Sequence, residues 1–362
     1  MSSIPDESAM YRALLRRDAA YDGVFIVAVK TTGIFCRPVC TARKPRRKNV
    51  EFFATTRDAL CAGYRPCKRC RPMDVHRKPP AWVRRLMDAV DQAPSGRFTD
   101  ADLRALSIEP ARARRYFKEH YGMTFHAYHR ARRMGLALAA VREGQDLNAV
   151  GLQHGFGSAS GFRDAFARIF GRPPGRGKDV RCLLAGWLDT PLGAMLAVAG
   201  DDGLHMLEFV DRRAIERQIE TLRKRLRAVI VPGTNEHLER IGDELARYFA
   251  GRLTEFTVPT ILTGSPFQVQ VWNRLAQIPY GQTLSYSQMA ADIGRAGTQR
   301  AVGRANGDNR IGIVLPCHRV VRSDGTLCGY GGGVWRKKWL LDHERCSAAD
   351  EQPQPCVAIR PA

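Results

Sequence analysis

The sequence predicts a multidomain protein of mixed class, in which small α/β units are combined with all-helical ones. Its 362 residues exceed one ordinary domain, and roughly 100 to 200 residues per domain predict two to four domains. Five of the ten cysteines fall between positions 36 and 70, helical periodicity runs from about 82 to 170, and short strand-like runs follow from 183. We therefore expect domains at 1–78, 79–178, 179–263 and 264–347, with a disordered tail at 348–362.

The charge balance indicates a polyanionic partner. Lys and Arg number 57 against 36 Asp and Glu, which gives a net charge of +21 in a chain that is 44% hydrophobic. A folded protein with this excess is typical of nucleic-acid binders, because basic side chains release counterions from phosphates. A basic surface that only maintains solubility is the less favoured alternative.

The N-terminus has no basic segment followed by an apolar run, and no stretch of about 18 apolar residues occurs. We expect a cytoplasmic, nucleoid-associated protein without membrane contact. In a reduced compartment cysteines indicate metal ligands or reactive thiols and not disulfides.

The first cysteine cluster has the spacing of a zinc site. Cys36 and Cys40 form C-x3-C, Cys67 and Cys70 form C-x2-C, and 26 residues separate the pairs. Two such turns can present four thiolates to one tetrahedral Zn²⁺, and the flanking Pro, Arg and Lys argue against core cysteines. Cys61 lies at an expected helix end, and we assign it to packing.

The basic stretch after Cys36 indicates a phosphate-binding surface beside the metal. The segments "TTGIFCRPVCTAR" and "GYRPCKRCRP" resemble the N-terminal zinc domain of the Ada regulators over about residues 1–78. The resemblance implies that Cys36 accepts a methyl group from a methylphosphotriester and that Arg43 contacts DNA.

A tetrathiolate zinc site carries a net charge of −2, so methylation of one sulfur would remove one negative charge facing a phosphate. At about 5 Å and a dielectric constant of about 20 that charge costs about 3 kcal/mol.

The middle of the chain reads as two helix-turn-helix units. Residues 99–120 predict a short helix capped by Thr99 or Asp100, a turn, and a second helix that starts near Pro110 and carries a basic face of Arg112, Arg114, Arg115 and Lys118. A second unit follows, in which Phe162, Phe166, Ile169 and Phe170 form an apolar stripe. By pattern alone, two amphipathic helices in a bundle are as good an interpretation as a DNA-binding unit. The run "GFGSASGFRDAF" with "FGRPP" resembles the AraC-type DNA-binding domain, which implies a linking helix at about 125–143. The segment "GRPPGRGKDV" is expected to be a linker.

The stretch from 183 to 209 predicts short strands in an α/β segment, and helices return from 267. Beyond them, "VLPCHRVV" pairs Cys317 with His318. A free thiol is mostly protonated at neutral pH, so it needs a base; His318 can supply one, directly or through water, and Glu344 can orient the imidazole. Taken alone, Glu344 is better explained as a solvated helix residue.

Residues 183–346 resemble the O6-alkylguanine-DNA alkyltransferase family through "PCHRV" and the preceding "GQTLSYSQMAADIGRAGTQRAVGRANGDN". The resemblance implies a ribonuclease H-like domain at 179–263 and a catalytic DNA-binding domain at 264–347. It makes Cys317 the irreversible alkyl acceptor, His318 the water-mediated base and Glu344 the group that orients it. It further implies that Asn309 braces the active-site turn, Arg300 enters the duplex, Tyr286 rotates the nucleotide out and Tyr330 lines the pocket. Base extrusion costs a few kcal/mol. Cys328 and Cys346 have no comparable context, and Cys182 and Cys356 are assigned to linker and tail.

Three resemblances in this order predict a bifunctional, single-turnover DNA repair methyltransferase and transcriptional activator of the Ada family. It would act on O6-methylguanine, O4-methylthymine and methylphosphotriesters, bind promoter DNA and RNA polymerase, and work as a monomer. A zinc-dependent transcription factor without repair activity is the alternative, and the combination of Cys317, His318, Asn309, Arg300 and Glu344 argues against it. A repair protein that does not regulate is a further alternative, against which the middle domain argues.

Overall fold

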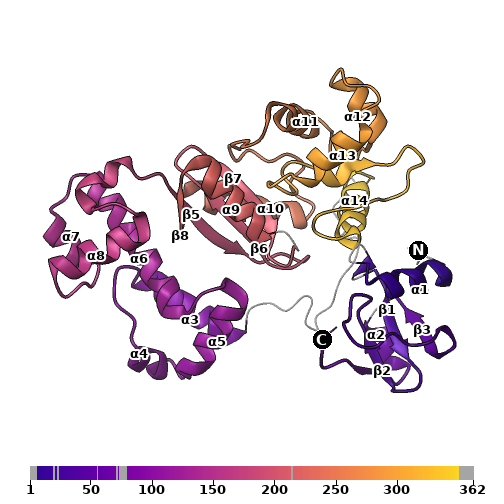
Figure 1. The fold of residues 1–362 in the computed structure, drawn as a ribbon, viewed down its shortest axis with the longest axis horizontal. Helices are drawn as coiled ribbons and strands as arrows, with labels where there is room; N and C mark the ends of the chain where they lie inside the picture. The colour runs from indigo at the N-terminus through magenta and orange to yellow at the C-terminus, as the bar shows by residue number, and fades with distance from the viewer. Residues whose placement is uncertain are drawn as a thin grey trace.

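The computed structural model describes residues 6–18, 21–22, 24–54, 56–70, 72, 80–212 and 215–349. The expected tail from 350 onward, Cys356, and most of the first linker, including the boundary at 78 and 79, lie outside the described residues. Figure 1 shows an N-terminal unit with a small sheet, a group of helices, a central sheet, and a second helical group that ends in α14. Among the described helices none has the length and apolar character that crossing a membrane requires.

The N-terminal unit is a four-stranded sheet between two helices. Its strand order is β3-β1-β2-β4, with β2 and β4 parallel and the other pairs antiparallel. Because side chains alternate across a strand, Val27 packs with α1 on one face, and Ile26 and Ala28 pack with α2 on the other. The elements are α1 (Glu7–Arg16), β1 (Ile26–Val29), β2 (Ile34–Cys36), η2 (Arg47–Asn49), β3 (Val50–Phe53), α2 (Thr56–Cys61) and β4 (Arg65–Pro66).

Six helices form the two expected helix-turn-helix units. Thr99, and not Asp100, caps the helix of the first unit, in a capping box with Asp102. The fully buried Phe162 and Phe166 anchor the second unit, and Ile169 is partly buried beside them. The helices are α3 (Ala81–Gln92), α4 (Asp100–Ala105), α5 (Pro110–Tyr121), the linking helix α6 (Phe125–Arg142), α7 (Leu147–Gln153) and α8 (Ala159–Phe170).

The segment expected to be a second linker is instead part of the helical core, so that expectation was wrong. Residues Pro174–Asp179 form the 3-10 helix η3, in which Pro174 and Gly177 are buried. A Cβ on Gly177 would lie 2.8 Å from Val141 and 3.3 Å from Phe166, so the backbone itself packs against α6 and α8. The proline and glycine content signalled a loop, but here it allows close packing.

The central unit is a four-stranded sheet, ordered β7-β6-β5-β8, with only β5 and β8 parallel. Helix α9 packs against one face and α10 against the other. Cys182 is the first residue of β5 and is half-buried, so its assignment to a linker was wrong. The elements are β5 (Cys182–Leu188), β6 (Met195–Ala199), β7 (Leu204–Phe209), α9 (Ile215–Leu226), β8 (Val229–Pro232) and α10 (Glu236–Phe249).

The linking helix of the helical unit is packed against the edge strand of this sheet. Val229 and Val231 of β8 join the core that contains Met134 of α6. The approach is close, because a Cβ on Gly135 would lie 2.8 Å from Val231. In the adjoining core the Trp187 ring centroid lies 4.6 Å from that of Tyr121 and 5.7 Å from that of Tyr128. The second helical unit and the sheet therefore share a hydrophobic core.

The C-terminal unit contains a third helix-turn-helix. Its elements are α11 (Pro266–Ala276), β9 (Leu284–Ser285), α12 (Tyr286–Asp292), α13 (Gln299–Gly307), η4 (Cys317–Arg319), β10 (Val320–Val321) and α14 (Val334–Ala349), with β9 and β10 parallel. Strand β7 also contacts this unit, because Leu207 forms a parallel β-bridge with Ile311. The central sheet thus supports the loop that leads to Cys317.

Candidate functional site: two thiol centres and their DNA-facing helices

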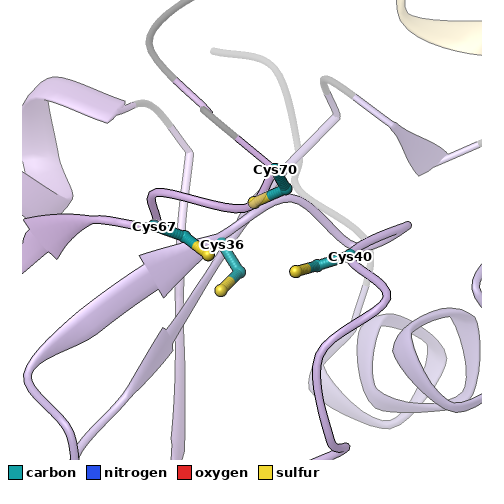
Figure 2. Close-up of side chains that lie close together, drawn as sticks. All are labelled: Cys36, Cys40, Cys67 and Cys70. Atoms are coloured by element: carbon teal, nitrogen blue, oxygen red, sulfur yellow. The ribbon is translucent and has the colours of Figure 1, made fainter.

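Four cysteines converge at the carboxyl ends of two neighbouring strands. Cys36 ends β2, and Cys67 directly follows β4, which runs parallel to it. Cys40 and Cys70 follow on turns three or four residues later, and all four sulfur atoms lie within 4.8 Å of one another. Figure 2 shows the four side chains gathered close together. The predicted ligand set is therefore brought together as expected.

The geometry and the thiol chemistry of this cluster fit Zn²⁺. Tetrahedral zinc binds four thiolates at about 2.3 Å, which requires sulfurs this close together. The hydrogen bond between Cys36 and Cys70, the largest influence on both thiols, raises the pKa of Cys36 and lowers the pKa of Cys70 to about 5. Four thiolates at this spacing need a cation to balance their charge. The backbone N–H of Arg37 donates to the Cys70 sulfur at 3.3 Å and helps to orient it.

The basic stretch beside the cluster divides into paired and exposed side chains. Arg37 forms an ion pair with Asp22, and Arg47 forms one with Glu7. Four other basic side chains of the stretch are exposed: Arg43, Lys44, Arg46 and Lys48. Arg17, which the sequence analysis missed, donates to the carbonyl of Cys40 at 3.1 Å and fixes the loop before Arg43. Arg17 is the C-cap of α1 in a left-handed conformation, and nothing in the neighbouring sequence indicates this contact.

Cys61 does not pack as expected. It ends α2, but its side chain is exposed, so the assignment to packing was wrong. Because α2 covers the sheet mainly with Ala59, the last turn of the helix projects beyond the core.

The helical unit presents a basic face on α5. Arg112, Arg114, Arg115 and Lys118 are exposed, while Phe117 is fully buried on the opposite side. Two of the arginines are also tethered, since Arg112 lies over the Trp82 ring at 4.9 Å and Arg114 lies 3.9 Å from Asp100. This face can meet a phosphate backbone or a DNA groove.

Cys317 lies at the start of η4 and is only 7% exposed. It lines a pocket with one wall from α13 and the following turn, one from the Gly-rich loop and one from the central sheet. Burial raises the pKa of the thiol, a hydrogen bond from Asn309 lowers it, and Glu208 raises it further. A thiol in this setting is protonated until a base removes its proton.

His318 and Glu344 form a buried pair of the kind that can provide such a base. Nε2 of His318 lies 2.8 Å from Oε1 of Glu344, and both side chains are fully buried. A carboxylate only accepts, so Nε2 carries the hydrogen and Nδ1 has a free lone pair. Among the described residues Nδ1 has no hydrogen-bond partner. Burial lowers the pKa of His318 and outweighs the nearby Glu344, which acts to raise it. The lowered pKa favours the neutral imidazole.

Glu344 is the centre of a larger network. Besides His318, it accepts from Nε of Arg319 at 2.8 Å, from the Tyr248 hydroxyl at 2.7 Å and from the Gly281 N–H at 3.2 Å. Burial alone would raise its pKa, but His318 and Arg319 lower it, so the group is a carboxylate. Glu344 is therefore not the solvated helix residue that the sequence allowed when this position was considered alone.

Asn309 braces the turn that carries Cys317. Its Nδ2 donates to the Leu315 carbonyl at 2.9 Å, and its Oδ1 accepts from the Ile311 N–H at 2.9 Å. Ile313 within this turn has φ +71°, which is unfavourable for a β-branched residue and persists only where the surroundings enforce it. The amide of Asn309 is placed to enforce it.

The remaining predicted residues lie on the pocket wall or on helices α12 and α13. Arg300 is exposed as the second residue of α13, the second helix of the helix-turn-helix. Tyr286 begins α12 and is half-buried, and its hydroxyl interacts with the Cys328 thiol. Tyr330 lines the pocket. Cys328 thus lies next to Tyr286, which its sequence context did not indicate.

An ion pair from the central sheet completes the pocket wall and was missed by the sequence analysis. Arg212 pairs with Glu208, and its guanidinium donates to the carbonyl of Asn309 at 3.1 Å and to that of Gly307. Gly331 lies against this guanidinium, since a Cβ there would be 2.5 Å from Cζ. The one available signal was a carboxylate in β7, a strand that is buried at every position.

Comparison with known proteins follows the same division of the chain. Residues 9–73 match the metal binding domain of Ada, residues 103–178 a helix-turn-helix domain, residues 183–262 the ribonuclease-like domain of 6-O-methylguanine DNA methyltransferase, and residues 266–346 its DNA binding domain. The methylated-DNA–protein-cysteine methyltransferase of Salmonella typhimurium is 45% identical over 45% of this chain and 95% of its own length.

Among solved structures, the O6-methylguanine methyltransferase of Mycobacterium tuberculosis is 38% identical, covers 46% of this chain and 94% of its own, and superposes with a TM-score of 0.40. The bifunctional transcriptional activator/DNA repair enzyme Ada of Escherichia coli is 36% identical over 350 residues, which cover 92% of this chain and 95% of that protein. With this identity along nearly the whole length of both proteins, the chain belongs to the Ada family.

Proposed function

We propose that this protein repairs alkylated DNA at two sulfur atoms and that one of the two repairs switches on transcription. Cys317 would take the methyl group of O6-methylguanine or O4-methylthymine, and Cys36 would take one from a backbone methylphosphotriester. The observation that carries the repair function is the buried Cys317 beside the His318–Glu344 pair, with an imidazole nitrogen free of described partners.

The chemistry at Cys317 is a single displacement. As Nδ1 of His318 accepts the thiol proton, directly or through a water, the sulfur forms a bond to the methyl carbon. The bond between that carbon and O6 breaks, its electron pair passes to the base, and guanine takes up a proton. The product thioether has no leaving group that the surrounding residues could activate, so each molecule would act once at this site.

Three residues would bring the damaged base to the thiol. Arg300 is exposed on α13, where a side chain can enter the duplex and fill the space that the base leaves. Tyr286 would help to rotate the nucleotide, and Tyr330 would line the pocket that receives it. Asn309 would hold the turn and could also contact the base.

At the first centre, Cys36 would act as a nucleophile and as a switch. Its sulfur would bond to the methyl carbon, and the released electron pair would leave the phosphate as an ordinary diester anion. Bound Zn²⁺ would keep the four sulfurs as thiolates at neutral pH. Methylation of Cys36 would remove one negative charge from the cluster and so reduce its repulsion of the DNA phosphates. Arg43, exposed on the loop beyond Cys40, would then contact the DNA.

The methylated protein would bind promoter DNA through the exposed arginines of α5 and recruit RNA polymerase. We further propose that it acts as a monomer in the cytoplasm, associated with the nucleoid, and that its domains divide at 78, 178, 263 and 347. A transcription factor without repair activity is disfavoured by the arrangement around Cys317, which a purely regulatory protein does not need.

A labelling experiment tests both acceptors. The full-length protein is incubated with duplex DNA that carries labelled O6-methylguanine or labelled methylphosphotriesters, and the label is located by peptide mass spectrometry. We expect it on Cys317 and Cys36 respectively, with loss of each signal in Cys317→Ser and Cys36→Ser. Cys61→Ser is the matched control, because Cys61 is an exposed thiol of the same domain. No label on Cys317 would refute the repair function.

A further inference from the structure

Asn306 is a buried amide in the acceptor pocket that the proposed chemistry leaves unused. It lies in α13, is 6% exposed and lines the pocket with Cys317 and Tyr330. A polar side chain buried this deeply is expected to satisfy all of its hydrogen-bonding groups.

Its donors fix the orientation of the amide. Nδ2 donates to the carbonyl of Cys317 at 3.2 Å and to the hydroxyl of Tyr286 at 3.4 Å. Because a carbonyl can only accept, the nitrogen and not the oxygen must face Cys317. The other atom, Oδ1, is buried and has no hydrogen-bond partner among the described residues.

Three other side chains of the site make contacts with groups other than this oxygen. The Tyr286 hydroxyl interacts with the Cys328 thiol. Arg212 donates to the carbonyls of Gly307 and Asn309, and Lys337 donates to the carbonyl of Val320. A buried acceptor without a partner, on a residue that lines a pocket, is satisfied when a ligand with a suitable N–H enters and reaches it.

The two alkylated bases differ in what they can offer this oxygen. Alkylation at O6 removes the N1–H of guanine, so the 2-amino group becomes the only N–H donor of the base. Thymine alkylated at O4 has lost its N3–H and retains no N–H donor. Resting on the proposed function, we propose that Oδ1 of Asn306 accepts a hydrogen bond from the 2-amino group of the extruded O6-alkylguanine and so favours guanine over thymine lesions.

A substrate comparison tests this role. Single-turnover transfer to Cys317 is measured at saturating duplex that carries O6-methylguanine, O6-methylhypoxanthine, which lacks only the 2-amino group, or O4-methylthymine. We expect the wild type to react about tenfold faster with O6-methylguanine than with the hypoxanthine analogue. In Asn306→Leu this ratio should fall to about one to two, whereas the rate with O4-methylthymine relative to the analogue should not change.

The ratio of two substrates on one protein separates recognition from general damage to the pocket. Asn273→Leu is the matched control, because Asn273 is exposed on α11. If Asn306→Leu does not fold, Asn306→Ala replaces it. A tenfold ratio that persists in the variant, or a wild-type ratio near one, overturns the role of Asn306 while methyl transfer itself continues. A wild type that takes no methyl group from any duplex overturns the proposed function, and this inference with it.

Discussion

Replacing Glu344 by glutamine removes one negative charge from the centre of the acceptor site and leaves the size of the side chain unchanged. Five donors converge on the two carboxylate oxygens: His318 Nε2, Tyr248 Oη, the Gly281 N–H, and Nε and Nη2 of Arg319. A glutamine offers one oxygen and an amide that cannot accept, so at least two of these donors lose their acceptor. Arg319, 6% exposed, then has no charged partner there.

The expected cost is large in both stability and rate. Removing one member of a buried ion pair costs about 3–5 kcal/mol, which is below the roughly 5–15 kcal/mol that holds a domain folded. The variant should therefore fold at 15 °C and melt earlier than the wild type. General-base catalysis contributes a factor of about 10²–10⁴ to a reaction rate. Without the carboxylate that orients His318, the rate of methyl transfer should fall about a hundredfold.

The assay is single-turnover methyl transfer to Cys317 at 15 °C with saturating O6-methylguanine duplex, alongside a thermal melt followed by circular dichroism. Asp342→Asn is the control on the same helix, because Asp342 is 48% exposed and pairs with Lys338 at 2.9 Å. A pair this exposed contributes about 0–1 kcal/mol. A folded Glu344→Gln protein that labels Cys317 at the wild-type rate would refute the assignment of His318 as an oriented base.

Three further outcomes follow from the same contacts. Because burial lowers the pKa of His318 below the value of about 6.5 of a free histidine, the transfer rate at saturating DNA should be flat from pH 8 to 7 and should decline only at a pH lower than a free histidine would give; a tenfold rise per pH unit from pH 7 to 8 would instead indicate a thiolate formed by solvent. Gly331→Ala should slow transfer at least about tenfold by displacing the Arg212 guanidinium, whereas Gly157→Ala, away from the pocket and with no atom within 4 Å of its new Cβ, should not; equal rates in stopped-flow assays would contradict the role of Arg212. Removing the metal with a chelator should expose the four clustered thiols to a thiol reagent and leave transfer to Cys317 intact, and a chelated protein that has lost both activities would argue against two independent centres.

Local spacing was enough to predict the thiol cluster, because its ligands come as two close pairs on turns. The partnership of His318 with Glu344 spans 26 positions; the residue types allowed it, and the family resemblance was needed to choose it over a solvated Glu344. Arg212 and Asn309 are 97 positions apart, and no local pattern marks a contact that depends on β7 reaching the catalytic loop. The segment around Pro174 failed for the opposite reason, since a loop-like composition was overridden by burial against α6.

The packing of α6 on β8 has a consequence for the protein after proteolysis. A cut within η3 would sever the chain between the helical unit and the sheet, but it would not separate the core that Met134, Val229 and Val231 share. The two fragments should remain associated through that apolar contact, as the halves of a split protein do. A nick at this place would therefore leave the helix-turn-helix units attached to the unit that holds Cys317, and fragment size on a denaturing gel would understate how much of the molecule stays associated.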